Sequence, residues 1–141
     1  MARVAAVTVR SPLRYAGWLG VALAAACAGQ GSVEDRAAVQ AALLFGTSAS
    51  AAPAKACELL APLTLEDLEG DEAGSCPRLL PEQGLPESSA ARGVEVFGKD
   101  AIVRLDRDTL FLARFEEGWR VTAAGCTANG DRPYDCVVKR G

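Results

Sequence analysis

Histidine is absent from the 141 residues of this chain, and methionine occurs only once. Histidine is the usual general base near neutral pH and a common metal ligand, so its absence leaves acid–base chemistry to Asp, Glu or Tyr. It also excludes zinc sites that combine Cys with His. The sequence has no glycine-rich phosphate loop and no nucleophile elbow. No familiar catalytic motif therefore predicts an activity.

Basic side chains are outnumbered by acidic ones, 15 to 18, which gives a net charge of −3. Because three arginines lie in the first 26 residues, which hold no acid, residues 27–141 carry a net charge of −6. Nucleic-acid binding requires clustered Lys and Arg, so we expect no nucleic-acid partner. The same sign disfavours adsorption to anionic lipid, so membrane attachment would require a covalent lipid.

The first 26 residues have the pattern of a bacterial export signal. Arg3, Arg10 and Arg14 precede an uncharged, mostly apolar stretch over residues 15–26. This stretch is shorter than the ~20 residues that a membrane-spanning helix needs. Its length and its basic leader are typical of a signal peptide. We therefore predict that residues 1–26 are removed and that the rest of the chain lies outside the cytoplasm.

The end of this stretch, Leu23-Ala24-Ala25-Ala26-Cys27, resembles the lipobox of bacterial lipoproteins. The resemblance implies that Cys27 becomes a lipid-bearing N-terminus, with palmitate or a similar acyl chain, on the extracytoplasmic face of the cell membrane. The small, polar residues 27–32 would then be a tether. The alternative is ordinary secretory cleavage after Ala26, because Ala24 and Ala26 also satisfy an Ala-x-Ala site.

Four cysteines remain after Cys27, and an even number in an exported chain favours two disulfides. The competing interpretation is a metal site. The spacings are unlike the close pairs of zinc fingers and ribbons, so we expect no metal. We predict the pairs Cys57–Cys76 and Cys126–Cys136, one in each half of the chain. A link between Cys57 and Cys126 would contradict this division.

Hydrophobic periodicity divides residues 33–141 into a helical half and a strand half. The first predicted helix covers 33–45, with Ser32 as its N-cap and Gly46 at its end. Three shorter helices are expected, over 54–60, 65–69 and 76–80. Thr64 is the expected N-cap of the helix over 65–69. Alternating apolar residues and hairpin turns predict antiparallel strands over 94–97, 101–105, 109–115, 119–124 and 134–138.

This order of elements resembles the NTF2-like (SnoaL-like) α+β domains. A closer resemblance, to small actinobacterial lipoproteins of uncharacterised function, is carried by several segments of this sequence: Cys57 with Leu59-Leu60, residues 75–76, 111–115, 118–126 and 131–136. The resemblance implies that residues 33–141 form one domain, with N-terminal helices packed on a curved antiparallel sheet of four to five strands. Such a cone encloses a pocket.

Few side chains are candidates for chemistry. Asp100, Asp106 and Asp108 lie near predicted strand ends and could bind a cation or act on a substrate, although turn formation is the simpler interpretation. Arg104 and Arg114 lie within predicted strands, where they could line an anion pocket or pair with Glu95 across the sheet.

Trp119 is expected in the core, because Val121 and Ala123 share its side of the strand. We name no catalytic residue and no cofactor. The leading hypothesis is a non-catalytic lipoprotein domain that binds an envelope protein or a small ligand. The alternatives are an NTF2-like enzyme that uses Asp or Glu in a sheet pocket, and a scaffold that only associates with other envelope proteins.

Overall fold

A computed structural model describes the backbone of residues 25–141 and the side chains of residues 33–131 and 133–141. The predicted leader over residues 1–26 therefore lies almost entirely outside the described residues, as does the side chain of Cys27. Four helices precede five strands: α1 (Ala25–Ser48), α2 (Pro53–Cys57), α3 (Pro62–Glu69), α4 (Cys76–Glu82), β1 (Ala91–Phe97), β2 (Asp100–Leu105), β3 (Thr109–Phe115), β4 (Gly118–Asn129) and β5 (Arg132–Lys139).

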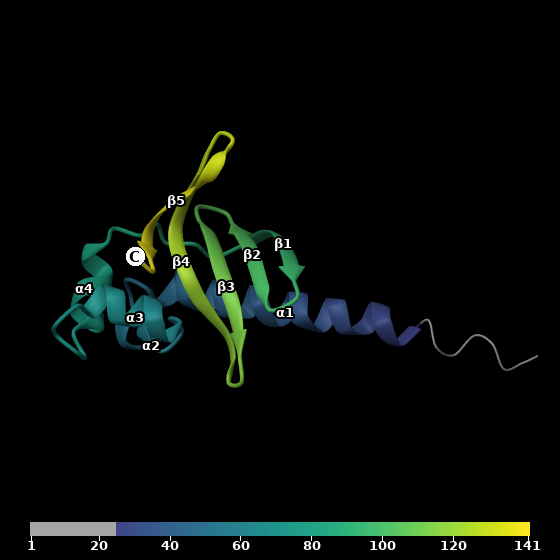
Figure 1. Cartoon of the computed structure of the whole chain (residues 1–141), viewed down its shortest axis with the longest axis horizontal. Helices are drawn as coiled ribbons and strands as arrows, with labels where there is room; N and C mark the ends of the chain where they lie inside the picture. The colour runs from purple at the N-terminus through teal and green to yellow at the C-terminus, as the bar shows by residue number, and fades with distance from the viewer. Residues whose placement is uncertain (1–24) are drawn as a thin grey trace, which may run out of the picture.

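The strands form one open antiparallel sheet in which each pairs with its neighbour in sequence, in the order β1-β2-β3-β4-β5. The short hairpin connections produce this order, because they leave no length for a crossover. Helix α1 crosses one face of the sheet, and α2, α3 and α4 gather beyond its C-terminal end (Figure 1). The predicted α+β class and antiparallel sheet are confirmed.

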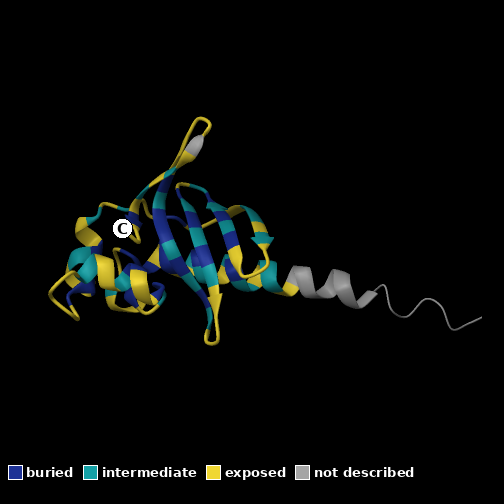
Figure 2. Cartoon of the chain, in the orientation of Figure 1, coloured by how far each residue is buried: buried dark blue, intermediate teal, exposed yellow. Residues whose placement is uncertain are grey.

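The core lies between α1 and the sheet. Ala38, Ala42 and Phe45 repeat at helical spacing along α1 and are almost fully buried. They meet buried strand residues, among them Val103, Leu110, Leu112, Trp119 and Val121. Buried residues alternate with more exposed ones along β2, β3 and β4 (Figure 2), because only one face of the sheet packs against the helix. The predicted core position of Trp119 is confirmed.

The first helix differs from its predicted bounds at both ends. It begins at Ala25, so residues 27–32 are helical and Ser32 is not its N-cap. The alanines at 25, 26 and 28 have the highest helix propensity and carry the helix through this segment. Gly46 does not end the helix either. A Cβ at Gly46 would lie 3.0 Å from Leu105 Cδ1 and 3.1 Å from Ser88 O, so this glycine permits close packing.

The predicted second helix ends early because its last residues pair with the sheet. Val121 N donates to Leu59 O at 2.8 Å, and Ala61 N donates to Val121 O at 2.8 Å. Residues 59–61 thus extend the edge of β4 where β5 does not reach, and they satisfy backbone groups that would otherwise be open. The next helix starts at Pro62 and not after Thr64, whose hydroxyl donates to Thr122 O instead.

Both predicted disulfides are present. Cys57–Cys76 joins α2 to α4, and Cys126–Cys136 joins directly opposed residues of β4 and β5. The hairpin that the second bridge closes is longer than predicted, because residues 127–129 continue β4, residues 132–133 begin β5, and only residues 130–131 form the turn. Each half of the chain therefore carries its own covalent link.

A bulge in β4 corrects one detail of the predicted core. Leu112 pairs with Val121, but Phe111 pairs with Ala123, so the register shifts by one residue between them. Side chains after the bulge change faces. Ala124, and not Ala123, therefore joins the core cluster that contains Trp119 and Val121.

Candidate functional site

The three aspartates singled out from the sequence do not form a cluster. Asp100 lies at the start of β2, opposite Phe97. Asp106 accepts hydrogen bonds from the backbone N–H groups of Ser89 and Ala90, at 3.1 and 3.3 Å. Within the described residues, no three Cys, Asp or Glu side chains group as a metal site would require. Turn formation explains Asp106 better than chemistry does.

Asp108 is buried, and its carboxylate is committed to the backbone. It accepts hydrogen bonds from the N–H groups of Thr109 at 2.7 Å, Gly125 at 3.0 Å and Cys126 at 3.2 Å. Burial raises the pKa of Asp108 above its ordinary value, although these hydrogen bonds act in the opposite direction. The side chain holds the turn before β3 against the bend in β4, and its acceptor oxygens are occupied.

The two strand arginines separate onto different faces of the sheet. Arg104 pairs with Glu95 across β1 and β2, at 2.5 Å between Nη1 and Oε1. This hydrogen bond raises the pKa of the Arg104 guanidinium. Arg114 pairs instead with Glu34 of α1, at 2.7 Å. The cross-strand alternative is therefore correct for Arg104, whereas Arg114 lies at a groove on the helix side.

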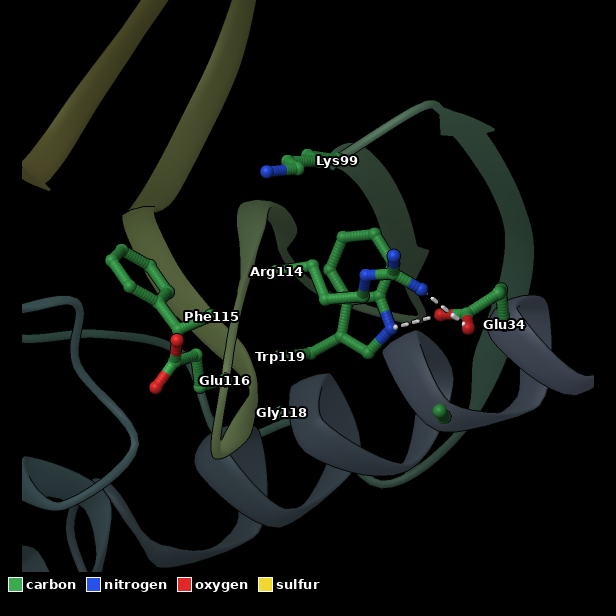
Figure 3. A pocket seen from close by; sticks show the side chains of 8 residues that line it. Glu34, Lys99, Arg114, Phe115, Glu116, Gly118 and Trp119 are labelled. Atoms are coloured by element: carbon green, nitrogen blue, oxygen red, sulfur yellow. Dashed lines mark hydrogen bonds and ion pairs between the residues drawn. The ribbon is translucent and has the colours of Figure 1, made fainter.

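This groove, of about 650 Å³, opens between the middle of α1 and the ends of two hairpins. Its lining combines cations, carboxylates and aromatic rings (Figure 3): Glu34, Ala37, Lys99, Arg114, Phe115, Glu116, Gly118 and Trp119. We call it the corner groove. Five of its eight lining residues are polar or charged or carry a polar N–H, namely Glu34, Lys99, Arg114, Glu116 and Trp119, and it is the candidate site.

Glu34 links the elements at this groove. Its Oε1 accepts from Arg114 Nη1 at 2.7 Å, and its Oε2 accepts from Trp119 Nε1 at 3.1 Å. Arg114 and Trp119 are paired residues of β3 and β4, so the hairpin register presents both donors to the same carboxylate. Figure 3 shows the guanidinium and the indole directed at Glu34.

Lys99 reaches the corner groove from the turn between β1 and β2. Its carbonyl oxygen accepts from Arg114 N at 2.7 Å, which fastens this turn beside the end of β3. Gly98 has a positive φ of 62°, so the turn can close in the two residues between the strands. Within the described residues, the Lys99 ammonium has no ion pair.

Sequence reasoning identified Arg114 but missed Glu34 and Lys99. The hairpin around Glu116 and Glu117 could have indicated that Arg114 faces Trp119, since the strands flank a short turn. Glu34 lies 80 residues before Arg114. Nothing local in the sequence shows which face of α1 meets the sheet edge.

The opposite face of the sheet carries a second, smaller hollow of about 260 Å³, lined in part by Phe97, Ile102 and Phe111. Phe111 packs edge-on against Tyr134 of β5, with ring centroids 5.2 Å apart. Its lining is apolar apart from Asp100 and Thr122. Phe111 and Trp119 therefore do not share a pocket, because they lie on opposite faces.

Comparison of the chain with protein-family models, with curated proteins and with solved structures finds no match in any of the three. Among the described helices, none combines the length and the apolar character needed to cross a bilayer. The functional argument therefore depends on the geometry of the corner groove.

Proposed function

We propose that the chain is a lipid-anchored, extracytoplasmic domain with a non-catalytic binding role, and that the corner groove is its binding surface. The observation that carries this proposal is the commitment of two carboxylates, those of the buried Asp108 and of Glu34 in the groove. Asp108 is bound by three backbone N–H groups, and both oxygens of Glu34 are occupied by Arg114 and Trp119. A general base or nucleophile requires an available oxygen. Polar groups around an open groove suit recognition instead.

The alternative of an NTF2-like enzyme receives less support. That alternative requires a carboxylate aimed into an enclosed sheet pocket. The space between α1 and the sheet is filled instead by Phe45, Leu110, Leu112 and Trp119, each 5 % exposed or less. Of the acids near the strand ends, Asp106 and Asp108 are hydrogen-bonded to backbone N–H groups at turns.

We infer that the architecture is a shortened form of the NTF2-like cone, as expected for a small actinobacterial lipoprotein. A long helix laid across one face of an antiparallel meander supports this inference. The unbroken path of α1 from the region of Cys27 to the domain supports a short link to the membrane. Glu34 lies seven positions after Cys27, which is about 10 Å of helix.

The anchor is tested by replacing Cys27 with Ser and following the chain in membrane and soluble fractions of the cell. We expect the variant to leave the membrane fraction. Ser32→Ala on the same helix is the matched control and should remain bound. Retention of the Cys27→Ser variant in the membrane would contradict the lipid anchor.

The binding role is tested by site-specific photo-crosslinking in intact cells. A photoreactive phenylalanine analogue at Ala37, which lines the corner groove, should yield a discrete adduct. The same analogue at the exposed Arg78 of α4, outside the groove, should not. Lys99→Gln should reduce the Ala37 adduct. Equal adducts from both positions, or none from Ala37, would contradict a binding role for this groove.

A further inference from the structure

We propose that Lys99, Arg114 and the indole N–H of Trp119 form a binding site for an organic carboxylate, and that Glu34 is its internal occupant. This inference rests on the proposed function, because it assigns a ligand chemistry to the same corner groove. A carboxylate from outside would replace Glu34 on its two donors and gain Lys99 as a third.

The contacts of Glu34 show what the donors recognise. Arg114 and Trp119 each donate to a different oxygen of one carboxylate, at 2.7 and 3.1 Å. Two parallel donors fit the two oxygens of a planar carboxylate, and the pairing of β3 with β4 fixes their separation. The donor pair therefore exists independently of Glu34, which belongs to a different element.

Glu34 can be displaced because its contacts are reachable by solvent. The side chains of Arg114 and Glu34 are 44 % and 33 % exposed. Ion pairs at this exposure contribute little to stability, since water competes for both partners. The indole of Trp119 is buried by the core, so the donor stays in place when its acceptor leaves.

Lys99 supplies the charge that favours an external anion. Glu34 compensates Arg114, which leaves the Lys99 ammonium as the cation without an ion pair at this corner of the described chain. Glu116 also lines the groove, but its carboxylate points away from Arg114 and Trp119 in Figure 3. The Lys99 ammonium also points away from these two donors in Figure 3, so its side chain must turn toward an entering carboxylate to add its uncompensated positive charge.

The groove also fits an apolar portion next to the carboxylate. Phe115 is 39 % exposed and lines the groove beside Arg114. A volume of about 650 Å³ accommodates a small organic acid or an acidic side chain of a peptide. Both sources present the same chemistry, and the probes below distinguish them.

The experiment follows the indole N–H resonance of Trp119 in the lipid-anchored protein, purified in a neutral detergent. Removal of residues 1–26 also removes Trp18, so one indole signal remains. The probes are glutarate, the peptide acetyl-Gly-Glu-Phe-Gly-amide, its Gln counterpart and inorganic phosphate. We expect a saturable shift with glutarate or the Glu peptide and none with the Gln peptide. The stronger of the two responses identifies the source of the carboxylate.

Three variants complete the test. Glu34→Gln removes the competing charge and should tighten binding about threefold or more. Lys99→Gln should weaken it about threefold or more, while Lys55→Gln, an equal charge change on α2 outside the groove, should leave it unchanged. Thermal unfolding of each variant shows that the fold is retained.

Each other outcome overturns the inference. An equal response to the Gln peptide or to phosphate would show that the groove does not select carboxylates, and the absence of any response would show that Glu34 is not displaced. Neither result affects the crosslinking test of the binding role. A failed crosslink with a positive titration would instead overturn a protein partner for the groove and retain the site for a small carboxylate.

Discussion

The carboxylate of Asp108 and the backbone N–H of Gly125, 17 residues apart in sequence, are joined by a hydrogen bond of 3.0 Å. The same carboxylate accepts from Cys126 and Thr109. The turn after β2 is thereby attached to the bend in β4, just before the disulfide to β5. One buried acid thus holds three strands at the end of the sheet opposite the corner groove.

Replacing Asp108 with Ala should destabilise the fold by about 2–4 kcal/mol, because it leaves three backbone N–H groups without their acceptor in a largely buried position. Urea unfolding followed by circular dichroism measures the loss. Asp100→Ala removes an exposed acid of the same sheet and should change the free energy of unfolding by less than about 0.5 kcal/mol. Similar losses from the two variants would contradict the structural role of Asp108.

Asp108 also predicts a pH dependence. Because burial raises its pKa in the folded state, the native chain binds this proton more tightly than the unfolded chain does. The contribution of Asp108 to stability is therefore largest below the ordinary pKa of 3.8 and falls as pH rises through the folded value. Unfolding free energies of the wild type, relative to Asp108→Asn, should decline between about pH 3 and about pH 6. An increase in this free-energy difference over the same pH range would show that the pKa of Asp108 is lowered, not raised, by folding.

Replacing Gly125 with Ala should destabilise the fold more than the same replacement at Gly98, another glycine with positive φ. Its φ is 66°, and a Cβ there would lie 2.8 Å from Leu85 Cδ2 and 3.0 Å from Val137. Gly98 has a similar φ of 62°, but a Cβ there would contact nothing within 4 Å. Gly98→Ala should cost about 1 kcal/mol from backbone strain, and Gly125→Ala about 2–4 kcal/mol from strain and overpacking. Equal losses in chemical denaturation would show that packing at Gly125 is irrelevant.

Removal of the Cys57–Cys76 bridge should loosen the helical half of the chain more than the sheet. The bridge joins α2 and α4, two short helices that are connected to the sheet mainly through residues 59–61. The double variant Cys57→Ala/Cys76→Ala should lose about 2–4 kcal/mol of stability. Amide hydrogen exchange should accelerate in α2 and α4 more than in β2 and β3. The matched Cys126→Ala/Cys136→Ala variant should instead accelerate exchange in β5, and uniform acceleration in both would contradict two separately linked halves.

The parts of the structure that could be predicted are those that local sequence determines. Strand alternation located the sheet, the hairpin turns fixed its order, and the even cysteine number with its spacings indicated both disulfides. The bulge that places Ala124 instead of Ala123 in the cluster with Trp119 depends on tertiary contacts, as does the pairing of residues 59–61 with Val121. Their sequences carry no signal that distinguishes these arrangements from a regular strand and a longer helix.

The candidate site illustrates the same limit. Arg114 is a candidate from the sequence because it lies within a predicted strand, and Glu95 is the partner that the sequence suggests. Its true partner depends on the face to which Arg114 projects. The end of β3 sets that face, and α1 brings Glu34 to it. The anchor at Cys27 and the leader over residues 1–26 remain predictions.

The ion pair between Glu34 and Arg114 should contribute little to folding even though it connects α1 to the sheet. Its side chains are 33 % and 44 % exposed, and solvent screening reduces such a pair to about 0.2–1 kcal/mol. A double-mutant cycle with Glu34→Gln and Arg114→Gln measures the coupling by urea unfolding. The pair Arg78–Glu72, at 57 % and 71 % exposure, is the matched control and should couple more weakly. Coupling above about 2 kcal/mol at Glu34 and Arg114 would mean that the helix depends on this contact. An external carboxylate could then not displace Glu34 without unfolding the start of the domain, so a small value is what a ligand-accessible groove requires.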